Sequence, residues 1–101
     1  MTNIHTHGLH LSPEGMQDNI LQIIKPKENK TYVYKIPEDH PSGTCWYHPH
    51  HHGAVNAQLT GLIAGALIVQ DRNDDFPSEL AAMEDNVFLI EGLCFTGCDI
   101  Q

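Results

Sequence analysis

Histidine is the residue type whose abundance and spacing in this 101-residue chain point to chemistry. The sequence contains eight histidines, more than its five lysine and arginine residues together. Four of them form two His-x-His pairs, His5 with His7 and His48 with His50. Residues two apart on a β-strand leave the same face about 6.5–7 Å apart, so each pair can bind neighbouring metal ions. The sequence therefore predicts a metal site with four imidazole ligands.

The ligand types narrow the choice of metal. Imidazole suits copper, zinc, iron and nickel, but neither pair is accompanied by the carboxylate of a two-histidine, one-carboxylate iron site. The three cysteines lack the paired spacing of a zinc site. No glutamate lies between His50 and Glu79, which excludes the histidine and glutamate pattern of cupins. We therefore expect copper or zinc.

A mononuclear blue-copper site is an alternative that stays open from the residues alone. Cys45, His48 and then His52 imitate the order of thiolate, imidazole and weak ligand in such a site. His7 would be the missing second imidazole. Cys45 is equally explained as a small buried apolar residue.

Four histidines are expected to lie outside the ligand set. His10 and His40 fit exposed positions, the latter in a turn. Alternation along the chain turns His51 away from His48 and His50. His52 has the same parity as these two, and we expect it to support the ligands or to lie at the surface.

Composition excludes several classes of protein. The length fits one domain, and the net charge of −8 would repel nucleic acid phosphates and anionic lipid. The longest apolar stretch, 59–69, is shorter than the roughly 20 residues of a membrane-spanning helix. No basic or apolar leader precedes His5, so we expect no signal peptide in this chain. Cys94 and Cys98 can form a disulfide in an oxidising compartment, so the compartment stays open.

Short apolar segments between turn residues predict an all-β sandwich with one or two short helices. Helical patterns cover 54–59 and 78–83, and 71–75 forms an acidic loop. We expect two parts, a domain over 1–70 that carries the metal ligands and a connecting region over 71–101 with the acidic loop, a short helix and a strand. The expected strands are 2–11, 20–24, 31–36, 44–47, 63–70 and 87–91.

Three ordered motifs carry a resemblance to a known family. They are His5-Thr6-His7-Gly8, the run from Gly43 to Gly53 that contains Cys45-Trp46-Tyr47-His48-Pro49-His50, and the run from Gly61 to Val69. Together, over residues 2–70, they resemble the amino-terminal cupredoxin domain of laccase-like multicopper oxidases. Phe or Tyr is more usual at the position of Cys45. The resemblance implies a cupredoxin-like Greek-key β-sandwich that lacks its first strands.

The resemblance also implies a ligand set and a reaction. His5 would bind the type 2 copper of a trinuclear cluster, while His7, His48 and His50 would bind its two type 3 coppers. Such an enzyme takes electrons from a small reducing substrate through a type 1 copper and reduces O₂ to water at the cluster. Asp18 lies near an acidic position that assists proton delivery in related enzymes, and it also fits a turn or strand-capping role.

The same resemblance predicts what the chain would need from elsewhere. The carboxy-terminal cupredoxin domain that supplies the other ligands and the type 1 site is not in this sequence. We therefore expect a fragment that is catalytically incomplete alone, from a periplasmic or secreted enzyme, with no nucleic acid or membrane partner. The alternatives are a stand-alone copper-binding or copper-sequestering module and a small blue-copper electron carrier that uses Cys45.

Overall fold

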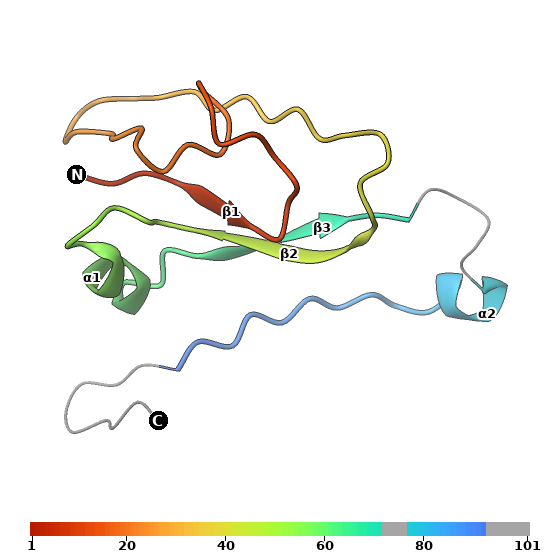
Figure 1. Cartoon of the computed structure of the whole chain (residues 1–101). Helices are drawn as coiled ribbons and strands as arrows, with labels where there is room; N and C mark the ends of the chain where they lie inside the picture. The colour runs from red at the N-terminus through yellow and green to blue at the C-terminus, as the bar shows by residue number, and fades with distance from the viewer. Residues whose placement is uncertain (72–76, 93–101) are drawn as a thin grey trace, which may run out of the picture.

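The chain folds around one small antiparallel sheet. The structure is a computed structural model that describes residues 1–71 and 77–92. Its strands are β1 (His5–His7), β2 (Gly43–His48) and β3 (Gly65–Val69), in the order β1-β2-β3, and its helices are α1 (Val55–Thr60) and α2 (Ser78–Ala81) (Figure 1). Strands in an antiparallel sheet with a few short helices confirm the predicted cupredoxin-like all-β class.

The register of the sheet brings the two histidine motifs together. The antiparallel pairing of β1 with β2 sets His5 opposite His48 and His7 opposite Trp46. Residues directly opposite in a ladder point to the same face, so these four side chains share one face of the sheet. The other face carries Cys45, which pairs with Leu67 of β3.

Gly8 ends β1 directly after His7. Its φ of +100° lies in the region that favours glycine, and a Cβ at this position would come within 3.0 Å of Cys45 Sγ. Both features require glycine here. The chain therefore leaves the sheet immediately after the first histidine pair.

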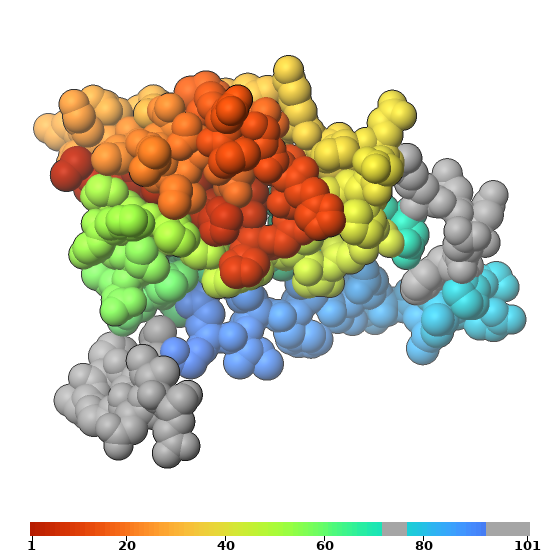
Figure 2. Space-filling model, viewed as in Figure 1, coloured from red at the N-terminus to blue at the C-terminus, as the bar shows by residue number. Residues whose placement is uncertain are grey.

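Long irregular segments lie on either side of the sheet. The connection from residue 8 to residue 42 runs along one side, and the extended segment 84–92 runs along the other (Figure 1). In the space-filling view this second segment forms a row of atoms below those of β2 (Figure 2). One isolated bridge, between Thr2 and Ile24, ties the long connection back to the start of β1.

The expected strands at 20–24 and 31–36 are wrong. In the segment 20–24, Ile24 alone pairs with another residue, through its isolated β-bridge to Thr2. In the second, Val33 donates its backbone N–H to the carbonyl of Met16, and Lys35 donates to the side chain of Gln17. The neighbouring segment consists of turns, which offer isolated acceptors in place of the regular ladder that a strand needs.

The other expected elements are confirmed in part. Residues 44–47 and 63–70 correspond to β2 and β3, 54–59 corresponds to α1, and the helix expected at 78–83 is α2, which ends at Ala81. The strand expected over 2–11 is limited to His5–His7, and the one expected at 87–91 is wrong because that segment has no ladder partner in the part of the chain that the structure describes. Most of the acidic loop, with Cys94 and Cys98, lies outside the described residues.

The few buried residues lie on both faces of the sheet and beside it. Among the described residues only Leu9 and Cys45 are buried hydrophobic side chains. The radius of gyration is 16.7 Å, against about 13 Å for a compact domain of this length. The small buried group is instead centred on polar residues and on the second histidine motif, namely Asn3, Thr6, His48 and Pro49.

Candidate metal centre

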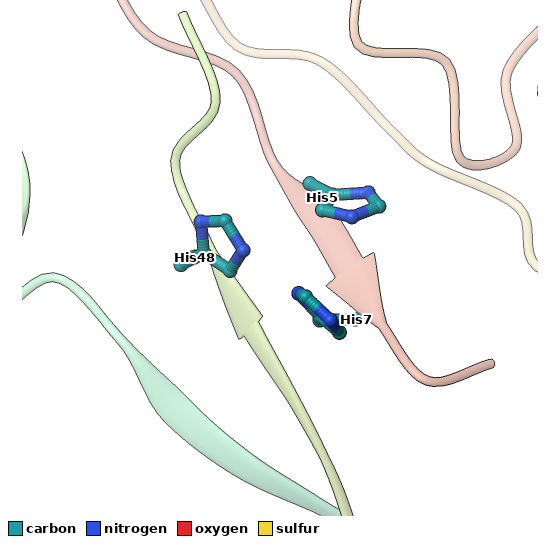
Figure 3. A group of neighbouring side chains, drawn as sticks. All are labelled: His5, His7 and His48. Atoms are coloured by element: carbon teal, nitrogen blue, oxygen red, sulfur yellow. The ribbon is translucent and has the colours of Figure 1, made fainter. Parts of the chain in front are cut away.

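Three histidines converge between β1 and the end of β2. One ligand nitrogen from each of His5, His7 and His48 lies within 4.8 Å of the others. Figure 3 shows their rings around one small space, two from β1 and one from β2. The ladder explains this convergence, because it sets the first pair beside the last residue of β2. The structure therefore brings together three of the four histidines that the sequence singled out.

His50 lies next to this group. Its ring centroid is 5.3 Å from that of His5 and 5.9 Å from that of His48. It follows β2 after Pro49, outside the ladder, and its Nδ1 atom is buried without a hydrogen-bond partner among the described residues. The fourth predicted histidine is thus adjacent to the other three but is not part of the tight group.

Asp18 orients the ring of His5. The two carboxylate oxygens lie 3.1 Å and 2.9 Å from His5 Nδ1, and one of them also accepts a 2.8 Å hydrogen bond from the backbone N–H of Thr6. A carboxylate can only accept, so the proton of neutral His5 is on Nδ1. The Nε2 lone pair is left free for a metal ion, which is the usual arrangement of a carboxylate behind a histidine ligand.

A backbone carbonyl fixes His48 in the same tautomer. His48 Nδ1 lies 3.0 Å from the carbonyl oxygen of Pro49, which accepts a hydrogen bond from Nδ1–H. Nε2 of His48 is buried and has no hydrogen-bond partner among the described residues. Burial is the main cause that lowers the pKa of His48, and the hydrogen bond to the Pro49 carbonyl opposes it. The pKa is lowered further by three neighbouring imidazoles, those of His5, His50 and His7. His48 is therefore held in the neutral form that binds metals.

The indole ring of Trp46 stacks on two of the histidine rings. Its ring stacks on that of His48 with centroids 4.1 Å apart and on that of His7 with centroids 5.3 Å apart, both at an interplanar angle of 24°. The stacking follows from the sheet, because Trp46 is two residues before His48 and directly opposite His7. Sequence reasoning missed this residue, although its parity with His48 was a usable signal.

Cys45 does not share a face with the histidines. It is buried, and it alternates with Trp46 and His48 along β2. A metal ion on the histidine face is therefore out of reach of its thiol. The blue-copper arrangement built on Cys45 is wrong, and the reading of Cys45 as a small buried residue that packs beside Gly8 agrees with the structure.

The other histidines lie outside the convergent group. His10 and His40 form a separate pair with ring centroids 4.9 Å apart, in which the backbone N–H of His10 donates to Nε2 of His40. His40 is half-buried and not exposed as expected. His51 is half-buried, and the exposed His52 lies 5.9 Å from His50 between ring centroids.

Comparison with known proteins identifies the family. A family model described as multicopper oxidase matches residues 1–74. The chain belongs to the multicopper oxidase family. The match covers both histidine pairs and all three strands.

Two kinds of curated multicopper oxidase relative illustrate the similarity. Multicopper oxidase mco of Staphylococcus epidermidis is 32% identical over 78 residues, which is 76% of this chain. Laccase-1 of Thanatephorus cucumeris is 31% identical over 75 residues, which is 72% of this chain. The chain spans 17% of the length of the first relative and 12% of the second.

The histidine group fits the copper that the multicopper oxidase family implies. Imidazole nitrogen suits copper in both of its common oxidation states. The decisive local feature is Nε2 of His48, because a buried polar atom without a partner is costly unless something binds it.

The structure contains no membrane-length apolar helix among the described residues.

Two further residues near the site were not found by sequence reasoning. Asn3 is buried two residues before His5, and its side chain contacts the backbone of His50. The buried hydroxyl of Tyr34 has a raised pKa because of burial and the nearby negative charge of Asp18. Neither residue is a histidine, a cysteine or a carboxylate, so a search for the common metal-ligand types would not select them.

Proposed function

We propose that this chain supplies four histidine ligands to the trinuclear copper cluster of a multicopper oxidase. His5 would hold the type 2 copper, and His7, His48 and His50 would hold the type 3 pair. When bound, the coppers supply the one-electron steps by which electrons from a small reducing substrate reduce O₂ to water. The observation that carries the proposal is the convergence of three imidazoles on one space, with Nε2 of His48 buried and unpaired.

The surrounding residues prepare the imidazoles to bind. Asp18 and the Pro49 carbonyl fix the protons of His5 and His48 on Nδ1, so that neither ring must change tautomer when metal binds. Trp46 restricts rotation of the rings it stacks on. Such pre-organisation lowers the entropy lost on binding and so raises affinity.

Asp18 is the candidate for proton delivery in this proposal. It accepts a hydrogen bond from Nδ1–H of His5, and the Thr6 N–H holds its carboxylate in place. A carboxylate within hydrogen-bond reach of a ligand ring and close to the site can take up and release protons there. The contact by which Asp18 orients the ring of His5 supports a role in proton delivery. The same contact gives Asp18 a structural role.

The remaining ligands would come from another domain. We propose that residues 1–70 form the copper-ligand part of a cupredoxin domain and that 71–101 lead toward the domain that completes the cluster. The periplasm or the extracellular space fits such an oxidase. Its partners would be O₂ and a reducing substrate, while the net charge of −8 disfavours nucleic acid.

One observation favours a second candidate function. The three-histidine group is formed by this chain alone, without ligands from elsewhere. Three imidazoles are sufficient to hold one copper ion. A stand-alone copper-binding or copper-sequestering module is therefore the alternative.

A copper titration of the full chain tests the ligand proposal. We expect Cu²⁺ binding by calorimetry and nitrogen couplings in the electron paramagnetic resonance spectrum. His48→Ala should weaken binding at least tenfold, because it removes the ligand with the unpaired buried nitrogen. His10→Ala, which changes a histidine outside the group, should leave affinity unchanged. Equal affinity of the wild-type and His48→Ala chains would exclude this site.

Oxygen consumption tests whether the chain needs a second domain for turnover. The full chain loaded with copper is given a phenolic reductant in an oxygen electrode. The half-cluster proposal predicts no steady turnover by this chain alone, because half of the ligands and the type 1 site are missing. Sustained consumption that depends on His48 would contradict the need for a second domain.

A further inference from the structure

Asn3 is a buried polar side chain to which copper chemistry assigns no role. It is 4% exposed, and both polar atoms of its amide have partners. Nδ2 donates to the carbonyl oxygen of Ile20 at 2.5 Å, and Oδ1 accepts from the backbone N–H of His50 at 2.7 Å. These partners lie 17 and 47 residues away along the chain. One amide therefore joins three distant segments.

The three segments are those that carry or orient the candidate ligands. Asn3 itself precedes His5 by two residues, and Ile20 follows Asp18, which orients the ring of His5, by two. The third segment is the turn after β2, which carries His50. Asn3 thus connects the support of the first histidine pair to the second pair.

The sheet fixes His48 but does not fix His50. The β1–β2 ladder ends at the pair His5–His48, and Pro49 has no N–H to donate. The N–H of His50 is therefore the first backbone donor beyond the ladder, and its acceptor is the side chain of Asn3. Loss of this contact leaves a backbone donor of a half-buried residue unpaired, so the turn would have to move to satisfy it.

We propose that Asn3 is a positioning residue that places His50 against the three converging histidines. It holds the backbone of His50 through Oδ1 and is itself held by the Ile20 carbonyl through Nδ2. A side chain with only one of these two functions would leave either His50 or the loop after Asp18 free to shift. The inference rests on the proposed function, because that function makes His50 a copper ligand.

A double-mutant cycle on the full chain tests whether Asn3 acts through His50. Asn3→Ala should weaken Cu²⁺ affinity by roughly 10–100-fold, the usual effect of removing a residue that supports a metal ligand. The matched control Asn29→Ala changes an exposed asparagine and should leave affinity unchanged. In a His50→Ala background the loss caused by Asn3→Ala should be much smaller, because only its contact with the Ile20 carbonyl remains to be lost. An equal loss in both backgrounds would overturn the proposal.

Amide exchange in the metal-free chain gives a second measurement that does not depend on copper. The His50 N–H should exchange at least tenfold faster in Asn3→Ala than in the wild type. Asn3→Asp keeps an oxygen that can accept the hydrogen bond, so the His50 N–H should stay protected from exchange in this variant. The Asn3→Asp chain can therefore be measured if Asn3→Ala does not fold. Equal exchange of the His50 amide in wild type and Asn3→Ala would overturn the proposal. If His50→Ala leaves copper affinity unchanged while exchange follows the expected pattern, the ligand role of His50 fails and the contact made by Asn3 stands.

Discussion

The two described regions, 1–71 and 77–92, use their side chains in opposite ways. In the first, buried side chains lie on both faces of the sheet, and polar ones such as Thr6 and His48 are buried as well as the hydrophobic Leu9. In the second, Phe88 and Ile90 are 83% and 91% exposed and have no strand partner among the described residues. Burial in this chain is therefore concentrated in the first region, where it includes polar as well as apolar side chains. Substitutions should separate the two regions sharply.

The largest expected difference is between two leucines. Leu9→Ala should lower the free energy of unfolding by about 2–3 kcal/mol, because it removes a buried side chain and leaves a cavity. Leu89→Ala, at a position 48% exposed, should change it by less than about 0.5 kcal/mol. Urea unfolding of the metal-free chain followed by Trp46 fluorescence measures both. Equal effects would show that segment 84–92 packs as tightly as the histidine region.

Loss of Asp18 should have the next largest effect. Asp18→Ala leaves His5 Nδ1 and the Thr6 N–H without their acceptor, and we expect Cu²⁺ affinity to fall by roughly 10–100-fold. Asp18→Asn retains an acceptor oxygen and should lose less. Calorimetric titration measures the affinities, with Asp39→Ala at an exposed position as control. An unchanged affinity for Asp18→Ala would remove Asp18 from the site.

Acidification should weaken the first region through His48. The pKa of His48 is lowered in the folded chain by burial, from an ordinary value near 6.5. As pH falls below about 6.5, His48 becomes protonated in the unfolded chain but stays neutral in the folded chain. The free energy of unfolding therefore decreases, and it levels off once the pH lies below the pKa of His48 in the folded chain. Urea unfolding at a series of pH values should detect this fall, and His48→Gln should reduce it. Bound copper should be released over the same range because protons compete for imidazole, and retention of copper well below pH 6.5 would contradict histidine ligation.

The parts of the site that sequence predicted are those fixed by strand periodicity. The two-residue spacing of His5 and His7 places both rings on one face of any strand, and an antiparallel partner that ends in His48 needs only the correct register. The supporting contacts could not be predicted in this way. Asp18 reaches His5 through an irregular loop, and Asn3 reaches across 47 residues to His50.

The errors in the predicted strands have a common physical cause. Alternation of Tyr32, Tyr34 and Ile36 indicates an extended chain, but a strand also requires a neighbour with a regular row of backbone donors and acceptors. The segment beside these residues consists of turns, so Val33 makes one backbone hydrogen bond to Met16 and no ladder forms. The alternation pattern therefore predicts an extended local conformation, but it does not show whether a neighbouring strand is present to pair with.

The smallest expected effect comes from the most exposed apolar residues. Phe88→Ser combined with Ile90→Thr should change the free energy of unfolding by less than about 0.5 kcal/mol, because neither side chain loses buried contacts. Copper affinity should also be unchanged, since all three converging histidines lie in the first region. The substitutions should instead reduce concentration-dependent association, measured by sedimentation velocity, because an unpaired extended apolar segment is a template for pairing with another chain. A fall in stability of more than 1 kcal/mol would mean that this segment is part of the fold that supports the histidines, and the contrast between the two regions would have to be abandoned.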